Sequence, residues 1–145
     1  MNVRNLLKKH EGLMLRPYKC PAGHWSIGYG HNLEAHGEFL PESITEEEAE
    51  EYLTKDIEKA IDDCQMQIPD FEGYDSVRKA VLIDMCYNMG VWKLIKFVRM
   101  LKAMHQYDWQ RAADELLDSK YARQVGSRSK ENAQMLITGL WPHEI

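Results

Sequence analysis

The chain of 145 residues is 44% apolar and 28% charged, which indicates one soluble globular domain with room for two small lobes and excludes a disordered protein. No stretch approaches the roughly 20 apolar residues that span a bilayer, and the N-terminal MNVRNLLKKHEG lacks the apolar core and cleavage site of a secretory signal. The formal charge of −5 argues against nucleic acid as the main partner.

A helix is predicted over residues 3–10, where apolar side chains recur at helical spacing, and Gly12 is expected to end it in a left-handed cap. Glu11 then lies at the C-terminus of this helix. The negative end of the helix dipole destabilises a carboxylate there, so this acid should stay protonated nearer to neutral pH than an ordinary glutamate.

Residues 14–40 are rich in glycine, proline and aromatic residues and predict two or three short strands. Cys20 precedes a Pro-Ala-Gly turn, and residues 25–31 alternate large and small side chains as one strand would. The small side holds Ser26 and two glycines, which predicts that another chain approaches the backbone closely there. This bare face is expected to form the wall of a cleft.

A long helix is predicted to begin after Thr45, because Thr45 and Glu48 have the spacing of a capping box. It should run to about residue 65, before Pro69, and its length of about 30 Å would let it join two lobes. Its expected apolar stripe consists of Ala49, Leu53, Ile57, Ala60, Ile61 and Cys64.

Residues 75–89 are apolar nearly all round, with Asp84 the only charge after Lys79, which predicts a central buried helix ending at Gly90. Three further amphipathic helices are predicted over residues 94–104, over 109–117 after Asp108, and from Ser127 or Ser129 to Gly139.

Charge and cysteines are distributed unevenly along the chain. Residues 42–63 contain ten acids and two lysines, whereas residues 76–105 contain six bases and one acid, so an anionic polymer would prefer the second half. Cys20, Cys64 and Cys86 are odd in number and widely spaced, which indicates reduced thiols, most of them in the core.

Taken alone, Glu11 is an ordinary surface acid and Ser26 an ordinary small strand residue. Together, an acid, the thiol of Cys20 and a hydroxyl that converge on a glycine-lined strand are what the cleft of a hydrolase requires.

The order Glu11, eight residues, Cys20, five residues, Ser26, within HEGLMLRPYKCPAGHWSIGYGH, resembles the motif of the phage-type lysozymes, the endolysins that cut peptidoglycan. That family has Glu, then Asp or Cys, then Thr, so Cys20 is a permitted variant and Ser26 keeps the hydroxyl without the methyl. The resemblance covers nearly the whole chain. It extends to TEEEAEEYLTKD, VRKAVLIDMCYNMG and YARQVGSRSKENAQMLITGLW, which are similar to the interdomain helix, the buried central helix and the C-terminal segment.

The resemblance implies an α+β, mostly helical, lysozyme-like fold. A small N-terminal lobe with a short antiparallel sheet would be joined by a long helix to an all-helical C-terminal lobe. The single catalytic domain, 1–145, would comprise 13–65 as the small lobe with the connecting helix, and 1–12 with 66–145 as the helical lobe.

The implied reaction is hydrolysis of the β-1,4 bond between N-acetylmuramic acid and N-acetylglucosamine in peptidoglycan glycan strands, without cofactor or metal. Glu11 would be the general acid. Cys20 would either activate a water, which inverts the sugar, or attack the sugar, which retains its configuration, and water activation is favoured. Ser26 would hold that water.

Asn32 and Tyr87 match positions that line the family's sugar-binding cleft, and Arg128 matches the family arginine that faces the catalytic acid from the C-terminal segment. All three are expected to bind substrate. His31 matches a histidine that pairs with an acid of the long helix, here Asp56, in a structural role. The resemblance further implies a monomer, no stable membrane association, and residence in the host cytoplasm until a separate holin gives access to the periplasm and cell wall.

Two alternatives belong to other classes. Cys20, His24 and His31 could ligate zinc in an amidase that cuts the peptide stems, although no HExxH motif occurs and the two histidines point to opposite faces of a strand. The second alternative is a non-catalytic module that binds the cell wall, and the presence of Glu11 argues against it.

Overall fold

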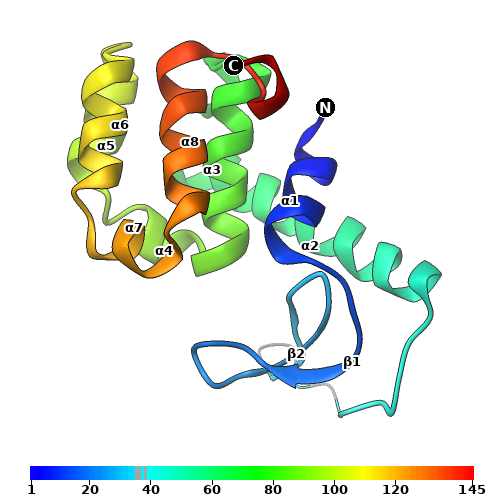
Figure 1. Cartoon of the computed structure of the whole chain (residues 1–145). Coiled ribbons are helices and arrows are strands. Elements are labelled where there is room, and N and C mark those ends of the chain that lie inside the picture. The colour runs from blue at the N-terminus through cyan, green and yellow to red at the C-terminus, as the bar shows by residue number, and fades with distance from the viewer. Residues whose placement is uncertain (35–36, 38) are drawn as a thin grey trace.

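The computed structural model describes residues 1–34, 37 and 39–145, and it places a small sheet beside a larger helical part, with one long helix running between them (Figure 1). The elements in chain order are α1 (Val3–Glu11), β1 (Met14–Lys19), β2 (Trp25–Gly28), β3 (His31–Asn32), α2 (Glu46–Gln67), η1 (Phe71–Gly73), α3 (Ser76–Met89), α4 (Val91–Leu94), α5 (Val98–His105), α6 (Trp109–Leu117), α7 (Lys120–Val125), α8 (Ser127–Thr138) and η2 (Pro142–Glu144).

Helix α1 begins at a side-chain cap and ends at the glycine that the sequence indicates. The Asn2 side chain accepts from the Asn5 amide at 2.9 Å, and the Gly12 amide donates to the Lys8 carbonyl. Gly12 has φ 71° and ψ 167°, so the predicted left-handed cap is wrong: φ is positive, but ψ sends the chain out extended into β1.

The sheet has the order β1-β2-β3 with antiparallel pairing throughout. The single strand predicted over residues 25–31 is wrong, because the chain turns at Gly28 and Gly30, both with positive φ, and Ile27 pairs with His31 across the resulting hairpin. Both glycines have close neighbours from other elements of the same chain. A Cβ on Gly28 would lie 3.5 Å from the Ala49 Cβ of α2, and one on Gly30 only 2.8 Å from Glu11 Oε2.

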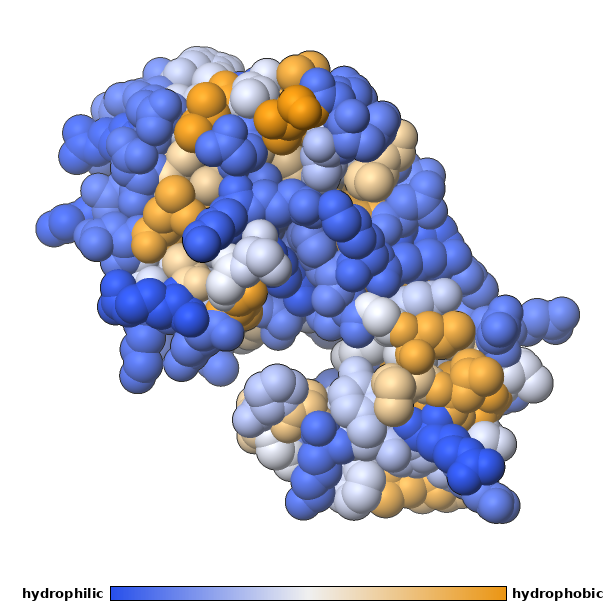
Figure 2. Space-filling view, in the orientation of Figure 1, coloured by the Kyte–Doolittle hydropathy of each residue, from blue (hydrophilic) through white to orange (hydrophobic). Residues whose placement is uncertain are grey.

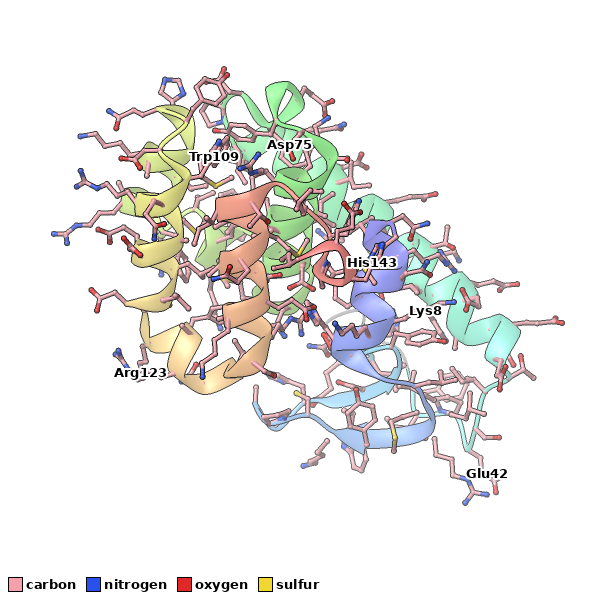
Figure 3. All side chains as sticks on the ribbon, turned by 45° about the horizontal axis from the view of Figure 1, so that its top comes forward. Lys8, Glu42, Asp75, Trp109, Arg123 and His143 are labelled. Atoms are coloured by element: carbon pink, nitrogen blue, oxygen red, sulfur yellow. The ribbon has the colours of Figure 1, made fainter. Side chains whose placement is uncertain are left out.

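Helix α2 is the predicted connecting helix, and its 22 residues span about 33 Å. The capping box is confirmed, since Thr45 Oγ1 accepts from the Glu48 amide and Glu48 Oε1 accepts from the Thr45 amide, both at 3.1 Å. One end packs on the sheet with Ile27, Leu33 and Ile44, and the other end packs in the helical core. Lys8 extends from α1 to α2, where it pairs with Glu50 (Figure 3).

Helix α3 is the predicted central helix, and every residue from Ala80 to Cys86 is buried. The predicted helix over residues 94–104 is wrong as one unit, because i to i+3 turns at Ile95–Phe97 separate α4 from α5. The break leaves Val98 exposed and lets Phe97 pack edge-on against Tyr121 of α7. Sequence reasoning does not predict helix α7, because six residues are too few to show a helical period.

Among the described residues, no helix is both long and apolar enough to cross a membrane. All three cysteines are unbridged, as their number and spacing predict. Cys64 and Cys86 lie in the core, and Cys20 is partly exposed.

Candidate active site

A cleft of about 1410 Å³ separates the sheet from the helical part. Figure 2 shows the hollow between them, with the β1–β2 hairpin forming the lower lip below α4 and α7. The cleft is larger than a small-molecule pocket of about 300–1,000 Å³, which suits a polymer chain. All six residues predicted to act on or bind a substrate line it: Glu11, Cys20, Ser26, Asn32, Tyr87 and Arg128.

The end of α1 brings Glu11 to the cleft, where its side chain is 14% exposed. Its Oε1 accepts from Arg128 Nη1 at 3.1 Å. Its Oε2 faces Gly30 so closely that any side chain there would collide with it. The carboxyl group is therefore held between an arginine of α8 and the backbone of the β2–β3 turn.

Arg128 reaches Glu11 from a position that Asp84 of α3 fixes. Its Nε donates to Asp84 Oδ2 at 3.0 Å and its Nη2 to Asp84 Oδ1 at 2.9 Å, which leaves Nη1 for Glu11. Burial opposes the arginine's charge, but the two carboxylates outweigh it and raise the pKa of Arg128. The planar guanidinium group of Arg128 therefore places a permanent positive charge beside the carboxyl group of Glu11.

Asp84 is fully buried, and its carboxylate accepts four hydrogen bonds. Besides the two from Arg128, it accepts from Asn132 Nδ2 at 2.8 Å and from His10 Nδ1 at 2.8 Å. Burial alone would raise the pKa of Asp84, yet the bonds from His10 and Arg128 prevail and lower it. The predicted central helix, α3, therefore contains an ionised carboxylate, that of Asp84, which holds Arg128 in position.

The sheet contributes the thiol and the hydroxyl. Cys20 closes the hairpin turn, where its amide donates to the His24 carbonyl at 2.9 Å and its carbonyl accepts from the Gly23 amide. Ser26 is 3% exposed, and its hydroxyl lies 3.4 Å from the His24 carbonyl, a long contact that leaves the hydroxyl free to rotate toward a better partner.

Two tyrosines line the same space. Tyr18 lines the cleft together with Glu11 and Cys20. Burial raises the pKa of Tyr18, and the negative charges of those two residues raise it further. The hydroxyl of Tyr87 donates to the Tyr29 carbonyl and so joins α3 to the β2–β3 turn. Tyr87 consequently offers its ring, rather than its hydroxyl, to the cleft.

The predicted pair of His31 and Asp56 is present, with Nδ1 and Oδ2 2.6 Å apart. His31 is buried and stacks on Tyr52 at a centroid distance of 4.1 Å. In the part of the chain that the structure describes, no three histidine, cysteine or acidic side chains gather in a group that could hold a metal ion. Cys20, His24 and His31 accordingly form no zinc site there.

Sequence reasoning missed Tyr18 and the partners of Asp84. Tyr18 lies near the end of β1, two residues before Cys20, and a two-residue spacing in an extended chain indicates that both side chains lie on one face. Asp84 stands out in the sequence as a lone charge in an apolar helix, and a buried charge requires partners, but the sequence contains nothing that identifies them as His10 and Asn132.

An acid held by an arginine, in an open cleft between a small sheet and a helical bundle, defines a hydrolase that acts on a polymer, with the architecture of the lysozymes. The chain matches the phage lysozyme family over residues 8–136, and it belongs to that family. It is therefore a glycoside hydrolase, a muramidase, and its substrate is peptidoglycan.

Several relatives are similar over most of the chain. An endolysin of Acyrthosiphon pisum secondary endosymbiont phage 1 is 32% identical over 127 residues, which are 86% of this chain and 81% of the endolysin. Probable T4-type lysozyme 1 of Dictyostelium discoideum is 27% identical over 161 residues, 95% of each chain. The pre-baseplate central spike protein Gp5 of Enterobacteria phage T4 is 28% identical over 163 residues, 96% of this chain but 28% of the spike protein.

Proposed function

We propose that the protein is an endolysin that hydrolyses the β-1,4 bond between N-acetylmuramic acid and N-acetylglucosamine, with Glu11 as the general acid. The observation that carries this proposal is the position of Glu11: its carboxyl group lines the cleft and is oriented from both sides, by Arg128 and by Gly30. An acid fixed in this way can protonate the glycosidic oxygen of a strand that lies in the cleft.

Cys20 and Ser26 are proposed to act on the attacking water. Both line the cleft from the sheet, whereas Glu11 enters from α1. A Cys20 thiolate would take the proton of the water, and the rotatable Ser26 hydroxyl would hold that water in place. This assignment gives an inverted product, whereas attack by the thiolate on the sugar would give a retained one.

Asn32, Tyr87 and Arg128 are proposed to bind the glycan strand. Asn32 is paired with Ser26 across the β2–β3 hairpin, so both side chains lie on one face of the sheet. The Tyr87 ring would supply an apolar surface for a sugar, and Arg128 would orient Glu11 at the point of cleavage.

Residues 1–145 are proposed to act as one catalytic domain and as a monomer, with the small lobe (13–65) and the helical lobe (1–12 with 66–145) forming the two walls of the cleft. The similarity to two phage proteins named endolysins supports a lytic role. On this proposal the protein waits in the host cytoplasm and reaches the periplasm and cell wall through a separately encoded holin, without nucleic acid or a membrane as partner.

The test compares Glu11→Gln with Glu51→Gln, an exposed glutamate on α2. Both variants are added, with a chelator present, to Gram-negative cells whose outer membrane has been permeabilised. We expect wild type and Glu51→Gln to clear the suspension and Glu11→Gln to lose activity by about 10²-fold or more. Clearing by Glu11→Gln would contradict the role of Glu11, and loss of wild-type activity that zinc restores would support the amidase alternative.

A further inference from the structure

The side chain of His10 lies behind the catalytic acid and touches two acids from two different helices. Nδ1 lies 2.8 Å from Asp84 Oδ1 on α3, and Nε2 lies 2.8 Å from Glu131 Oε1 on α8. Only 6% of the side chain is exposed. The other charges near the ring are Lys9, which pairs with Glu131 at 2.7 Å, and Arg128, which pairs with Asp84.

These contacts determine the protonation state of the ring. Ionised carboxylate oxygens accept hydrogen bonds and cannot donate them, so both ring nitrogens must donate. A neutral imidazole has one N–H, so the two contacts together require the imidazolium.

The alternative, a protonated carboxyl group that donates to the ring, does not fit either acid. Both oxygens of Asp84 already accept two hydrogen bonds each, from His10, Asn132 and the Arg128 fork. Burial tends to raise the pKa of Glu131, but its bonds from Lys9 and His10 lower it. Burial tends to lower the pKa of His10, and the bonds to Asp84 and Glu131 raise it.

We propose that His10, as a doubly protonated cation, is a positioning residue that keeps Arg128 on Glu11 by neutralising Asp84. The charges balance in pairs: His10 offsets Asp84, Lys9 offsets Glu131, and the charge of Arg128 is left for Glu11. When His10 loses its proton, Asp84 has only Arg128 to compensate it, and the arginine is drawn from the catalytic acid. The proposal rests on the role proposed for Glu11, but the effect that it predicts directly is on the position of Arg128.

Glu131→Gln separates the charge of His10 from its hydrogen bonds. The side-chain amide that this substitution introduces can donate to Nε2 of a neutral ring, so the network stays complete without the second proton, and the loss of the anion moves the titration of His10 to lower pH. In both proteins, NMR follows the titration of the His10 ring and the Arg128 Nη1–H signal, which reports the bond to Glu11, and glycan cleavage gives kcat.

In wild type, we expect the Arg128 Nη1–H signal and kcat to fall as pH rises through the His10 titration. In Glu131→Gln, all three transitions should move to lower pH. KM should change little. His10→Gln should lower kcat by about 10- to 100-fold at every pH, the scale of loss when a reacting group is misplaced by about 1 Å. His105→Gln, which removes an exposed histidine paired with Asp70, should change none of these values.

The proposal is overturned if the Arg128 signal and kcat keep their pH dependence while the His10 titration moves. It is also overturned if His10→Gln keeps the wild-type kcat. If His10→Gln does not fold, the comparison of Glu131→Gln with wild type still decides. Activity of Glu11→Gln would contradict the proposed function. The coupling between the Arg128 signal and the His10 titration is measured by NMR alone, so it can be tested whether or not the proposed function holds.

Discussion

Cys20 is the one cysteine of the chain that is not buried, and it lines the cleft at the hairpin turn. If its thiolate activates a water, Cys20→Asp should keep substantial activity, because a carboxylate performs the same step. Cys20→Ala should lose about 10²-fold. A small alkylating reagent should inactivate wild type while Cys64 and Cys86, both in the core, stay unmodified by mass spectrometry. Full activity of Cys20→Ala would show that Cys20 has no catalytic part.

Asp84 makes the site sensitive to pH from both sides. Its pKa is lowered from 3.8, so its stabilising effect is present above that value and is lost as pH falls through the folded pKa. The pKa of His10 is raised from 6.5, so its stabilising effect is present below that value and is lost as pH rises through the folded pKa. Both stabilising effects are therefore fully present between pH 3.8 and pH 6.5.

Asp84→Asn should therefore lower the free energy of unfolding by about 3–5 kcal/mol within this window, because it leaves buried cations without their partner. The loss should shrink at more acid and at more alkaline pH. Urea unfolding across the pH range measures it, with the exposed Asp62→Asn as the control. A loss that does not vary with pH would rule out this account of the network.

At the scale of elements, the β2–β3 turn limits where Glu11 can lie. Gly30→Ala would place a Cβ 2.8 Å from Glu11 Oε2 and should move the acid, lowering kcat by about 10-fold or more. Gly37→Ala is the matched control, because its φ is also positive but nothing lies within 4 Å of the new Cβ. Both variants should lose about 1 kcal/mol of stability to backbone strain. Equal kcat values for the two would mean that the turn does not position Glu11.

The same turn is tied to α2 through His31 and Asp56. His31→Asn should lower the free energy of unfolding by about 3–5 kcal/mol, because the pair is largely buried and the acid is left without this partner. His24→Asn removes an exposed histidine that lies 3.5 Å from Glu34, and its loss should be below about 1 kcal/mol. Thermal unfolding of both variants provides the comparison. Similar losses would show that the buried pair contributes no more to the free energy of unfolding than an exposed one.

Local signals in the sequence are enough to predict the longer helices. The Thr45–Glu48 capping box, the apolar stripe of α2 and the all-round apolar character of α3 each have a cause within a few residues, and each is present in the structure. The hairpin at Gly28 and the break at Ile95–Phe97 depend on packing against distant segments. Periodicity along the chain contains no information on such contacts.

At the scale of the whole molecule, the spacing of Glu11, Cys20 and Ser26 predicted a single site, and the structure brings all three to one cleft. What the sequence could not supply is the connection behind Glu11. His10, Asp84 and Arg128 belong to α1, α3 and α8, which are separated by up to 118 positions (128 − 10) in the chain. Their contacts follow from helix packing, so only the folded chain identifies them as one network.

The central claim, hydrolysis of a glycosidic bond by Glu11, is tested most directly by cleaving purified peptidoglycan in water labelled with heavy oxygen. Each cut should leave one labelled oxygen at a new reducing end of N-acetylmuramic acid, trapped by rapid reduction and read by mass spectrometry. Glu11→Gln should produce these ends at least about 10²-fold more slowly. New free amines without new reducing ends, or unlabelled anhydro-sugars, would contradict the account.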